Sequence, residues 1–88
     1  MKTKEGFMLR TVGGRSVVVA VGKAADTFNG LITLNDSGVF LWNLLACGAT
    51  HDELLEKMLE EYDVTEMTAR AGLDRFLEKV RGAGLIDD

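Results

Sequence analysis

The 88-residue sequence has no proline, one cysteine, one histidine and no long apolar run, and each shortage excludes something. A lone cysteine, Cys47, cannot form an internal disulfide, which is typical of proteins in a reducing compartment. No run of about 18 apolar residues is present to span a membrane. No apolar core follows the basic residues at the start of the chain to form a secretion signal. We therefore expect a cytoplasmic protein.

The scarcity of histidine and cysteine also removes most kinds of catalytic and metal site. Zinc takes three or four ligands at recognised spacings, which His51 and Cys47 alone do not supply. His51 is the only general base of the usual kind, and no serine or threonine nucleophile has a base nearby in the sequence. Cys47 closes a predicted helix, where the helix dipole disfavours a reactive thiolate, so we expect a small packing residue. The sequence predicts a binding protein without cofactor, metal or enzymatic activity.

Length and charge indicate one small domain, residues 1–88, made of two unlike halves. A chain of this length supports a single modest hydrophobic core. Residues 1–34 carry a net charge of +3 and residues 35–88 a net charge of −7, which together give the −4 of the whole chain. An acidic half discourages general binding to the phosphates of nucleic acids.

The first 34 residues show the composition and period of β-strands. Three strands are predicted: Phe7–Val12, Ser16–Val21 and Leu31–Leu34. Gly13 and Gly14 favour a hairpin between the first two strands, with a loop of three or four residues. The connection over residues 23–30 is expected to be irregular and to close with an Asn29-Gly30 turn. We expect one antiparallel sheet of three strands.

The rest of the chain shows the period of α-helices. Three helices are predicted: Asp36–Ala46, His51–Tyr62 and Glu66–Gly82. Asn35 and Thr65 are suited to cap helices, and Thr50 with Glu53 forms the pattern of a capping box. The residues Leu85-Ile86 are expected to pack back onto the core. The fold class is therefore α+β, in the order βββααα. A helix-turn-helix beside a hairpin would give a winged-helix shape.

The junction Leu31–Ala46 joins the two halves without a loop, because Asn35 caps a helix directly after the third strand. The only tryptophan, Trp42, lies in this junction and is expected to pack in the core. Gly38, in the first helical turn, leaves two readings open. Either another backbone approaches it closely, or it lies at an ordinary surface position.

The third strand is a candidate binding edge. Leu31, Ile32, Thr33 and Leu34 include no proline and no charged residue that would block pairing with another chain. Such an edge is covered by another part of the chain or used by a partner. An extended peptide can add to it as a strand, and a second copy of the chain can pair with it to form a homodimer.

The third helix offers a second candidate surface. Its core stripe consists of Ala69, Leu73, Phe76 and Val80. Leu77 lies on one flank of this stripe, and Arg70, Asp74 and Arg81 lie just beyond it. An apolar spot rimmed by two arginines suits a peptide that bears an apolar anchor and an acidic residue. The alternative is a plain core helix with a solvated border.

Two other functions are compatible with the predicted shape. A winged-helix DNA-binding regulator would use the third helix, whose basic residues are Arg70, Arg75, Lys79 and Arg81. Its acidic residues Glu66, Asp74 and Glu78, and the acidic second helix beside it, disfavour this use. A structural subunit that only completes another protein's sheet is the third alternative.

Seven short segments between Phe28 and Ile86 together match the sequence pattern of a known family. They are Asn29–Gly38, Phe40–Trp42, Gly48–Thr50, Glu53-Leu54, Glu61–Val64, Phe76-Leu77 and Gly84–Ile86. With this set the sequence resembles the PqqD family, whose members recognise the leader peptides of ribosomally made, modified peptides. The most specific part is the passage from strand to helix, in which Asn35 is followed by Gly38 and Trp42.

The resemblance implies three strands followed by three helices. It implies that a leader peptide adds as a strand beside Leu31–Leu34 and packs in a pocket that includes Leu73 and Leu77. It further implies partnership with a peptide-modifying enzyme, often a radical SAM protein, which would hold the cofactors. The hypothesis from sequence is a module that binds a precursor peptide and delivers it to such an enzyme.

Overall fold

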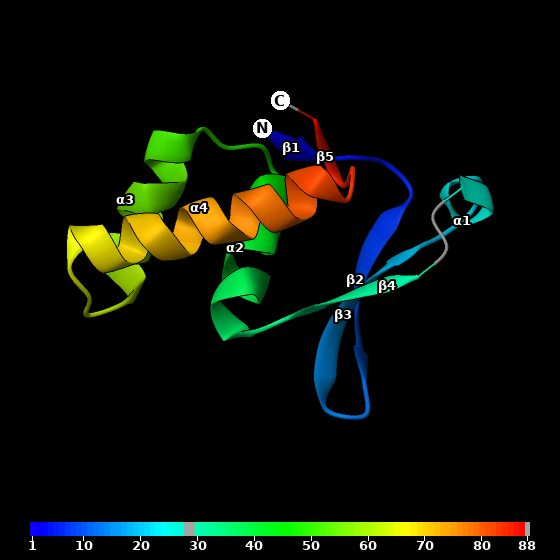
Figure 1. The fold of residues 1–88 in the computed structure, drawn as a ribbon, viewed down its shortest axis with the longest axis horizontal. Coiled ribbons are helices and arrows are strands. Elements are labelled where there is room, and N and C mark those ends of the chain that lie inside the picture. Colours follow the sequence, from blue (N-terminus) through cyan, green and yellow to red (C-terminus); the bar gives the residue numbers. More distant parts are fainter. Residues whose placement is uncertain (28–29, 88) are drawn as a thin grey trace.

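The structure, a computed structural model, describes residues 1–27 and 30–87. Along the chain lie β1 (Lys2–Thr3), β2 (Phe7–Val12), β3 (Arg15–Ala20), α1 (Ala24–Thr27), β4 (Leu31–Leu34), α2 (Asp36–Ala46), α3 (His51–Glu61), α4 (Glu66–Gly82) and β5 (Ile86–Asp87) (Figure 1). The predicted α+β fold, with a three-stranded antiparallel sheet followed by helices, is confirmed. The sequence analysis missed β1, β5 and the short helix α1. The predicted turn at Asn29 lies outside the described residues.

The main sheet has the strand order β2-β3-β4, with both pairs antiparallel. Val12 pairs with Arg15, so the hairpin loop contains only Gly13 and Gly14. Their φ angles of 59° and 80° are the left-handed values that the two central residues of a type I′ hairpin turn require. The predicted loop of three or four residues is therefore wrong, and β3 begins and ends one residue earlier than predicted.

The register places Val18, Ile32 and Leu34 on the sheet face that contacts the core, and Val17, Val19 and Leu31 on the other face. Val18 and Leu34, both at most 6% exposed, belong to the core, while Ile32 packs against it. Side chains alternate between faces along a strand, so Leu31 points to the other face, where it is 59% exposed. On that face Val19 lies between Met8 and Leu31 in one cross-strand row.

The helices begin where the capping residues predicted. Asn35 Oδ1 accepts a hydrogen bond of 2.8 Å from the Gly38 N–H, so α2 starts directly after β4. The capping box of Thr50 and Glu53 is present at α3, and Thr65 caps α4. Gly38 is buried, and a Cβ there would stand 3.2 Å from the Leu34 Cβ. Gly38 therefore does not lie at an ordinary surface position. The atoms closest to it belong to the side chains of Leu34 and Asn35, so no other backbone approaches it closely.

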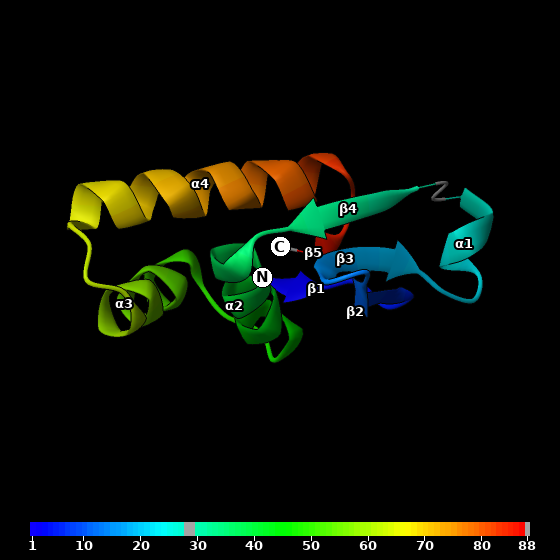
Figure 2. The same cartoon turned by 90° about the horizontal axis from the view of Figure 1, so that it is seen from below.

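The core is formed mainly among the three long helices, and Val18 and Leu34 of the sheet and Leu85 and Ile86 pack into it. In Figure 2, α4 lies at the top with α2 and α3 below it, and β4 lies beside the C-terminal end of α4. Trp42 is 4% exposed and packs in this core, as predicted. Cys47 is exposed, so its predicted role as a packing residue is wrong.

The two ends of the chain are joined to the same part of the fold. β1 pairs antiparallel with β5 (Figure 1). The Met1 ammonium donates to the Ala49 carbonyl oxygen at 2.9 Å, and the Ala49 N–H donates to the Met1 carbonyl oxygen at 2.9 Å. Leu85 and Ile86 are buried in the core, which confirms the predicted return of this segment. In the described part of the chain, none of the helices has the length and apolarity needed to cross a membrane.

Candidate functional site

The strand β4 pairs with β3 along one side, and its other side faces α4. From α4, the Lys79 ammonium donates a hydrogen bond of 2.8 Å to the Thr33 carbonyl oxygen. This contact indicates that Thr33 directs its main-chain groups away from β3. Because main-chain groups alternate sides along a strand, Leu31 directs its own groups the same way. The outer side of β4 is therefore an edge that carries main-chain donors and acceptors.

A groove of about 1140 Å³ lies along this edge, between β4 and α4. Three parts of the chain line it. The β4–α2 junction contributes Thr33, Leu34, Asn35, Ser37 and Gly38. The end of α3 and the following turn contribute Met58, Tyr62 and Val64. The helix α4 contributes Thr68, Ala69, Gly72, Arg75, Phe76, Glu78 and Lys79.

The groove changes in chemistry along α4. Near the first turns of α4 the lining is mainly apolar and includes Val64 and Ala69, together with Tyr62 and Thr68. The Tyr62 ring is held edge-to-face against Phe40, with ring centroids 5.6 Å apart. Further along α4 the lining includes the cationic side chains of Arg75 and Lys79. The groove can therefore hold an apolar side chain and an anionic one.

Gly72 forms an unfilled part of the groove wall. It lies in the middle of α4, where glycine costs about 1 kcal/mol of stability relative to alanine. A Cβ at Gly72 would meet no atom within 4 Å, so packing within the chain does not require glycine there. The open space beside Gly72 leaves room for atoms of a bound molecule.

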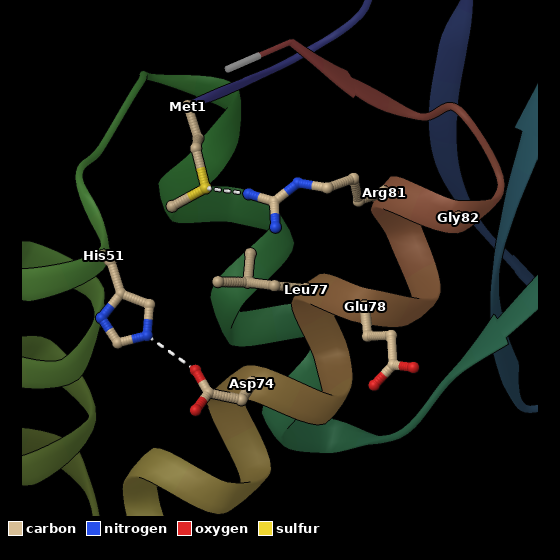
Figure 3. A pocket seen from close by; sticks show the side chains of 7 residues that line it. All are labelled: Met1, His51, Asp74, Leu77, Glu78, Arg81 and Gly82. Atoms are coloured by element: carbon tan, nitrogen blue, oxygen red, sulfur yellow. Dashed lines mark hydrogen bonds and ion pairs between the residues drawn. The ribbon is translucent and has the colours of Figure 1, made fainter.

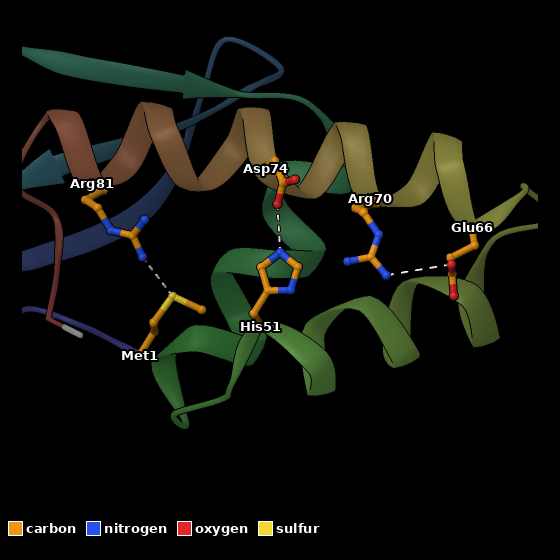
Figure 4. Close-up of polar contacts among 6 residues, drawn as sticks. All are labelled: Met1, His51, Glu66, Arg70, Asp74 and Arg81. Carbon is orange, nitrogen blue, oxygen red and sulfur yellow. Dashed lines mark hydrogen bonds and ion pairs between the residues drawn. The ribbon is translucent and has the colours of Figure 1, made fainter.

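The other flank of α4 faces α3 and the start of the chain. A hollow of about 650 Å³ there is lined by Met1, His51, Asp74, Leu77, Glu78, Arg81 and Gly82 (Figure 3). His51 Nε2 lies 2.7 Å from Asp74 Oδ1. Figure 4 shows Arg70, Asp74 and Arg81 on this flank; Arg70 pairs with Glu66 at 3.7 Å. Arg81 donates to the Met1 sulfur at 3.3 Å.

The structure separates the predicted site residues into three groups, which are the β4 residues, two core leucines of α4 and the residues on the α3 side of α4. Thr33 and Leu34 line the groove, whereas Leu31 is exposed and Ile32 is half-buried. Leu73 is fully buried and Leu77 is 4% exposed, so both belong mainly to the core. Arg70, Asp74 and Arg81 lie on the flank of α4 that faces α3. They are not brought together with β4.

The sequence analysis missed the groove residues of α4. Gly72, Arg75 and Lys79 follow one another at helical spacing, and Arg75 and Lys79 flank the core stripe on the side opposite to Arg70 and Asp74. A helical wheel gives both flanks but does not say which one faces β4. That choice depends on how α4 packs.

The polar groups of the described residues offer little reactive chemistry. No cluster of three or more potential metal ligands is found in residues 1–27 and 30–87. The hydrogen bond from the Thr50 backbone N–H, with a smaller contribution from the Thr50 side chain, holds the pKa of the Glu53 carboxyl below its usual value. Glu53 belongs to the capping box of α3 and lines neither the groove nor the hollow. Its lowered pKa is therefore a property of the helix cap and does not mark a binding site.

Comparisons with known proteins identify a family and a shared fold. The family model of coenzyme PQQ synthesis protein D (PqqD) matches residues 7–86. The chain therefore belongs to the PqqD family, which confirms the resemblance seen in the sequence. No match is found among curated proteins.

Two solved structures share the fold. The first is TbiB1 in complex with the TbiA(beta) leader peptide, with a TM-score of 0.75 and 21% identity over 100% of both chains. The second is a lasso peptide synthetase B1 complexed with its leader peptide, with a TM-score of 0.72 and 13% identity over 96% of this chain and 93% of the other.

Proposed function

We propose that this chain binds the leader segment of a ribosomally made precursor peptide in the groove between β4 and α4. The leader adds as a strand beside β4 and packs against α4. The chain then presents the peptide to a modifying enzyme, of which a radical SAM protein is one kind. The open edge of β4 beside an unfilled groove is the observation that carries this proposal. Membership in the PqqD family and two fold relatives that hold leader peptides support it.

Strand addition explains how the groove can bind peptides of different sequence. The main-chain groups of Leu31 and Thr33 that face outward would pair with the peptide backbone and supply affinity. Alternate peptide side chains would point into the groove, where the apolar lining and the cations supply specificity. In this proposal Leu34 and Leu73 support the groove from the core.

The predicted residues Arg70, Asp74, Leu77 and Arg81 give a rival location for the peptide. The hollow that Asp74, Leu77 and Arg81 line is smaller, at about 650 Å³ against about 1140 Å³, and none of the residues that line it belongs to a strand. The groove is therefore the better supported location.

On this proposal the protein is a binding module, with residues 1–88 acting as one domain in the cytoplasm. The chemistry and any cofactor belong to the partner enzyme. A winged-helix regulator that binds DNA remains the rival function, and Arg70, Arg75 and Arg81 on α4 are its strongest support. Glu66 in the first turn of α4 opposes it, because the start of a recognition helix approaches the DNA.

The test is to titrate the protein into a fluorescein-labelled leader segment of the precursor peptide encoded beside its gene. We expect saturable binding with a Kd of about 10 µM or tighter by fluorescence anisotropy. Labelled duplex DNA is the control, and a regulator would retain it with a steep dependence on salt. Binding to DNA without binding to the leader segment would contradict the proposal.

A further inference from the structure

Lys79 occupies part of the edge to which a peptide strand would add. Its ammonium nitrogen lies 2.8 Å from the Thr33 carbonyl oxygen. A hydrogen-bonded neighbouring strand would place an amide nitrogen at about 2.9 Å from the same oxygen. Lysine is one of the residues with which proteins block open sheet edges. The residues of β4 carry no charge, but α4 supplies the blocking cation from outside the strand.

A peptide strand that takes over this carbonyl leaves the Lys79 ammonium without its acceptor. Hydrogen bonds between an ammonium group and a carboxylate are among the stronger ones in proteins. Arg75 lines the same groove one helical turn earlier. Among the interactions described for residues 1–27 and 30–87, none engages the Arg75 side chain. Two cations would thus be available to an anionic group of the peptide.

The charge around Arg75 and Lys79 differs in sign from the net charge of the helical half. Residues 35–88 carry a net charge of −7, so most of the helical surface repels an acidic peptide. In the groove, Glu78 is the acidic residue of the lining, against Arg75 and Lys79. The local excess of positive charge lies beside the outward carbonyl of Thr33.

We infer that Lys79 is a specificity-determining residue that exchanges the Thr33 carbonyl oxygen for a carboxylate of the bound peptide. The inference rests on the proposed function. In the free protein the Lys79 ammonium occupies the Thr33 carbonyl oxygen at the edge of β4. When a peptide adds as a strand, its N–H displaces the ammonium from Thr33, and an acidic peptide side chain receives the ammonium, with Arg75 beside it. The preferred ligand is therefore an extended peptide with an aspartate or glutamate at the position facing Lys79.

The experiment measures peptide binding to the wild-type protein, to Lys79→Met and to Lys57→Met. Methionine keeps most of the length of lysine and removes the charge. Lys57, on α3, pairs with Glu60 at 3.6 Å and lines neither the groove nor the hollow. Lys57→Met is therefore a matched control. The probes are the synthetic leader segment encoded beside the gene and versions in which each aspartate or glutamate is replaced by its amide.

For the wild-type protein and Lys57→Met, we expect one amide replacement to raise Kd about 5-fold, the range of a partly exposed ion pair. For Lys79→Met, the acidic peptide and the same amide peptide should bind within about 2-fold of each other. The amide peptide should bind Lys79→Met at least as tightly as it binds the wild type, because no ammonium needs to be displaced from Thr33.

If the acidic peptide still binds Lys79→Met about 5-fold more tightly than the amide peptide does, the inference is overturned. Weaker binding of the amide peptide to Lys79→Met than to the wild type would also overturn it, since Lys79 would then support the peptide in another way. Wild-type binding without any dependence on peptide acids would overturn the inference and leave the proposed function intact. A wild-type protein that binds none of the peptides would overturn both.

A measurement on the Lys79 side chain in ¹⁵N,¹³C-labelled protein tests the exchange itself. In the free protein we expect a scalar coupling across the hydrogen bond from Nζ to the Thr33 carbonyl carbon. Addition of the acidic leader should remove this coupling and shift the Nζ resonance. A coupling that survives saturation with peptide would show that the ammonium does not leave Thr33, which contradicts the exchange.

Discussion

His51 Nε2 and Asp74 Oδ1 lie 2.7 Å apart, and their contact joins the start of α3 to the middle of α4. Asp74 thereby faces α3, whereas Lys79, further along the same helix, contacts Thr33 of β4. The two flanks of α4 therefore serve different neighbours. The flank that faces β4 borders an open strand edge, and the flank that faces α3 joins α3 to α4. Each flank can be tested separately.

Asp74→Asn should leave peptide binding almost unchanged. Both partners of the His51 pair are partly exposed, at 35% and 58%, so the loss of stability should stay below about 1 kcal/mol. We expect Kd for the leader segment within about 2-fold of the wild type by anisotropy, and the same for Arg70→Ala. A 10-fold loss of affinity in either variant, with the fold retained in urea denaturation, would place the peptide on the α3 side.

Gly72→Leu should separate stability from binding. Leucine is a far better helix former than glycine, and a Cβ at Gly72 meets no atom within 4 Å, so we expect a gain of up to about 0.8 kcal/mol in urea denaturation. The same side chain would fill the groove and should raise Kd for the leader segment by about 10-fold or more.

Gly82→Leu is the matched control for Gly72→Leu. Gly82 also lies in α4 and also has open space at its Cβ, but it lines the hollow on the other flank. We expect its affinity for the leader segment to match that of the wild type. Equal affinities of both leucine variants would mean that the space beside Gly72 is not used.

Asn35→Ala should destabilise the start of α2. It removes the acceptor of the Gly38 N–H, a hydrogen bond of 2.8 Å, and the loss of such a cap costs about 1 kcal/mol. For a domain of this length that lowers Tm by about 4–8 °C. Asn35→Asp keeps a capping oxygen and should stay close to the wild type in thermal unfolding followed by circular dichroism. If the alanine and aspartate variants melt together, the side-chain cap does not stabilise α2.

The capping box of α3 should make a small, pH-dependent contribution to stability. The Thr50 backbone N–H, which donates to the Glu53 carboxylate at 3.0 Å, lowers the pKa of Glu53 in the folded protein. A lowered pKa means that the charged form is the one favoured by folding. Its contribution is therefore complete above the unfolded pKa and is lost as the pH falls through the folded value.

Glu53→Gln tests this direction, because glutamine can still accept the Thr50 hydrogen bond but does not titrate. We expect the wild type to melt above Glu53→Gln at pH 7 and the difference to shrink as the pH falls below about 4.5, the ordinary pKa of this group. A difference that stays constant down to pH 3 would show that the charge of Glu53 does not contribute.

The sequence predicted the long elements of this fold because their signals are local. The capping residues Asn35, Thr50 and Thr65 and the 3.6-residue period of the apolar side chains place the three long helices to within about one residue. The pairing of β1 with β5 escaped prediction, because each strand has only two residues and its partner lies at the other end of the chain. Two-residue strands carry no usable period.

The residues that line the candidate groove were predicted only in part, because the choice of helix flank depends on contacts between distant parts of the chain. The edge of β4 was identified from the lack of charge and proline in Leu31–Leu34, which is a property of four consecutive residues. The choice between the two flanks of α4 depends on tertiary packing, and the flank with Arg70 and Asp74 was chosen. The structure places Arg75 and Lys79 toward β4 instead. Their spacing was visible in the sequence, but their direction was not.

The most direct test of the proposed function is an NMR titration of the ¹⁵N-labelled protein with the leader segment encoded beside its gene. We expect the largest amide shifts at Leu31–Leu34 and around Gly72 and Lys79, and small ones around His51 and Asp74. We also expect the outward amide of Leu31 to become protected from hydrogen exchange, as strand pairing requires. Shifts that avoid both β4 and the groove side of α4 would contradict the proposal that this edge holds a peptide.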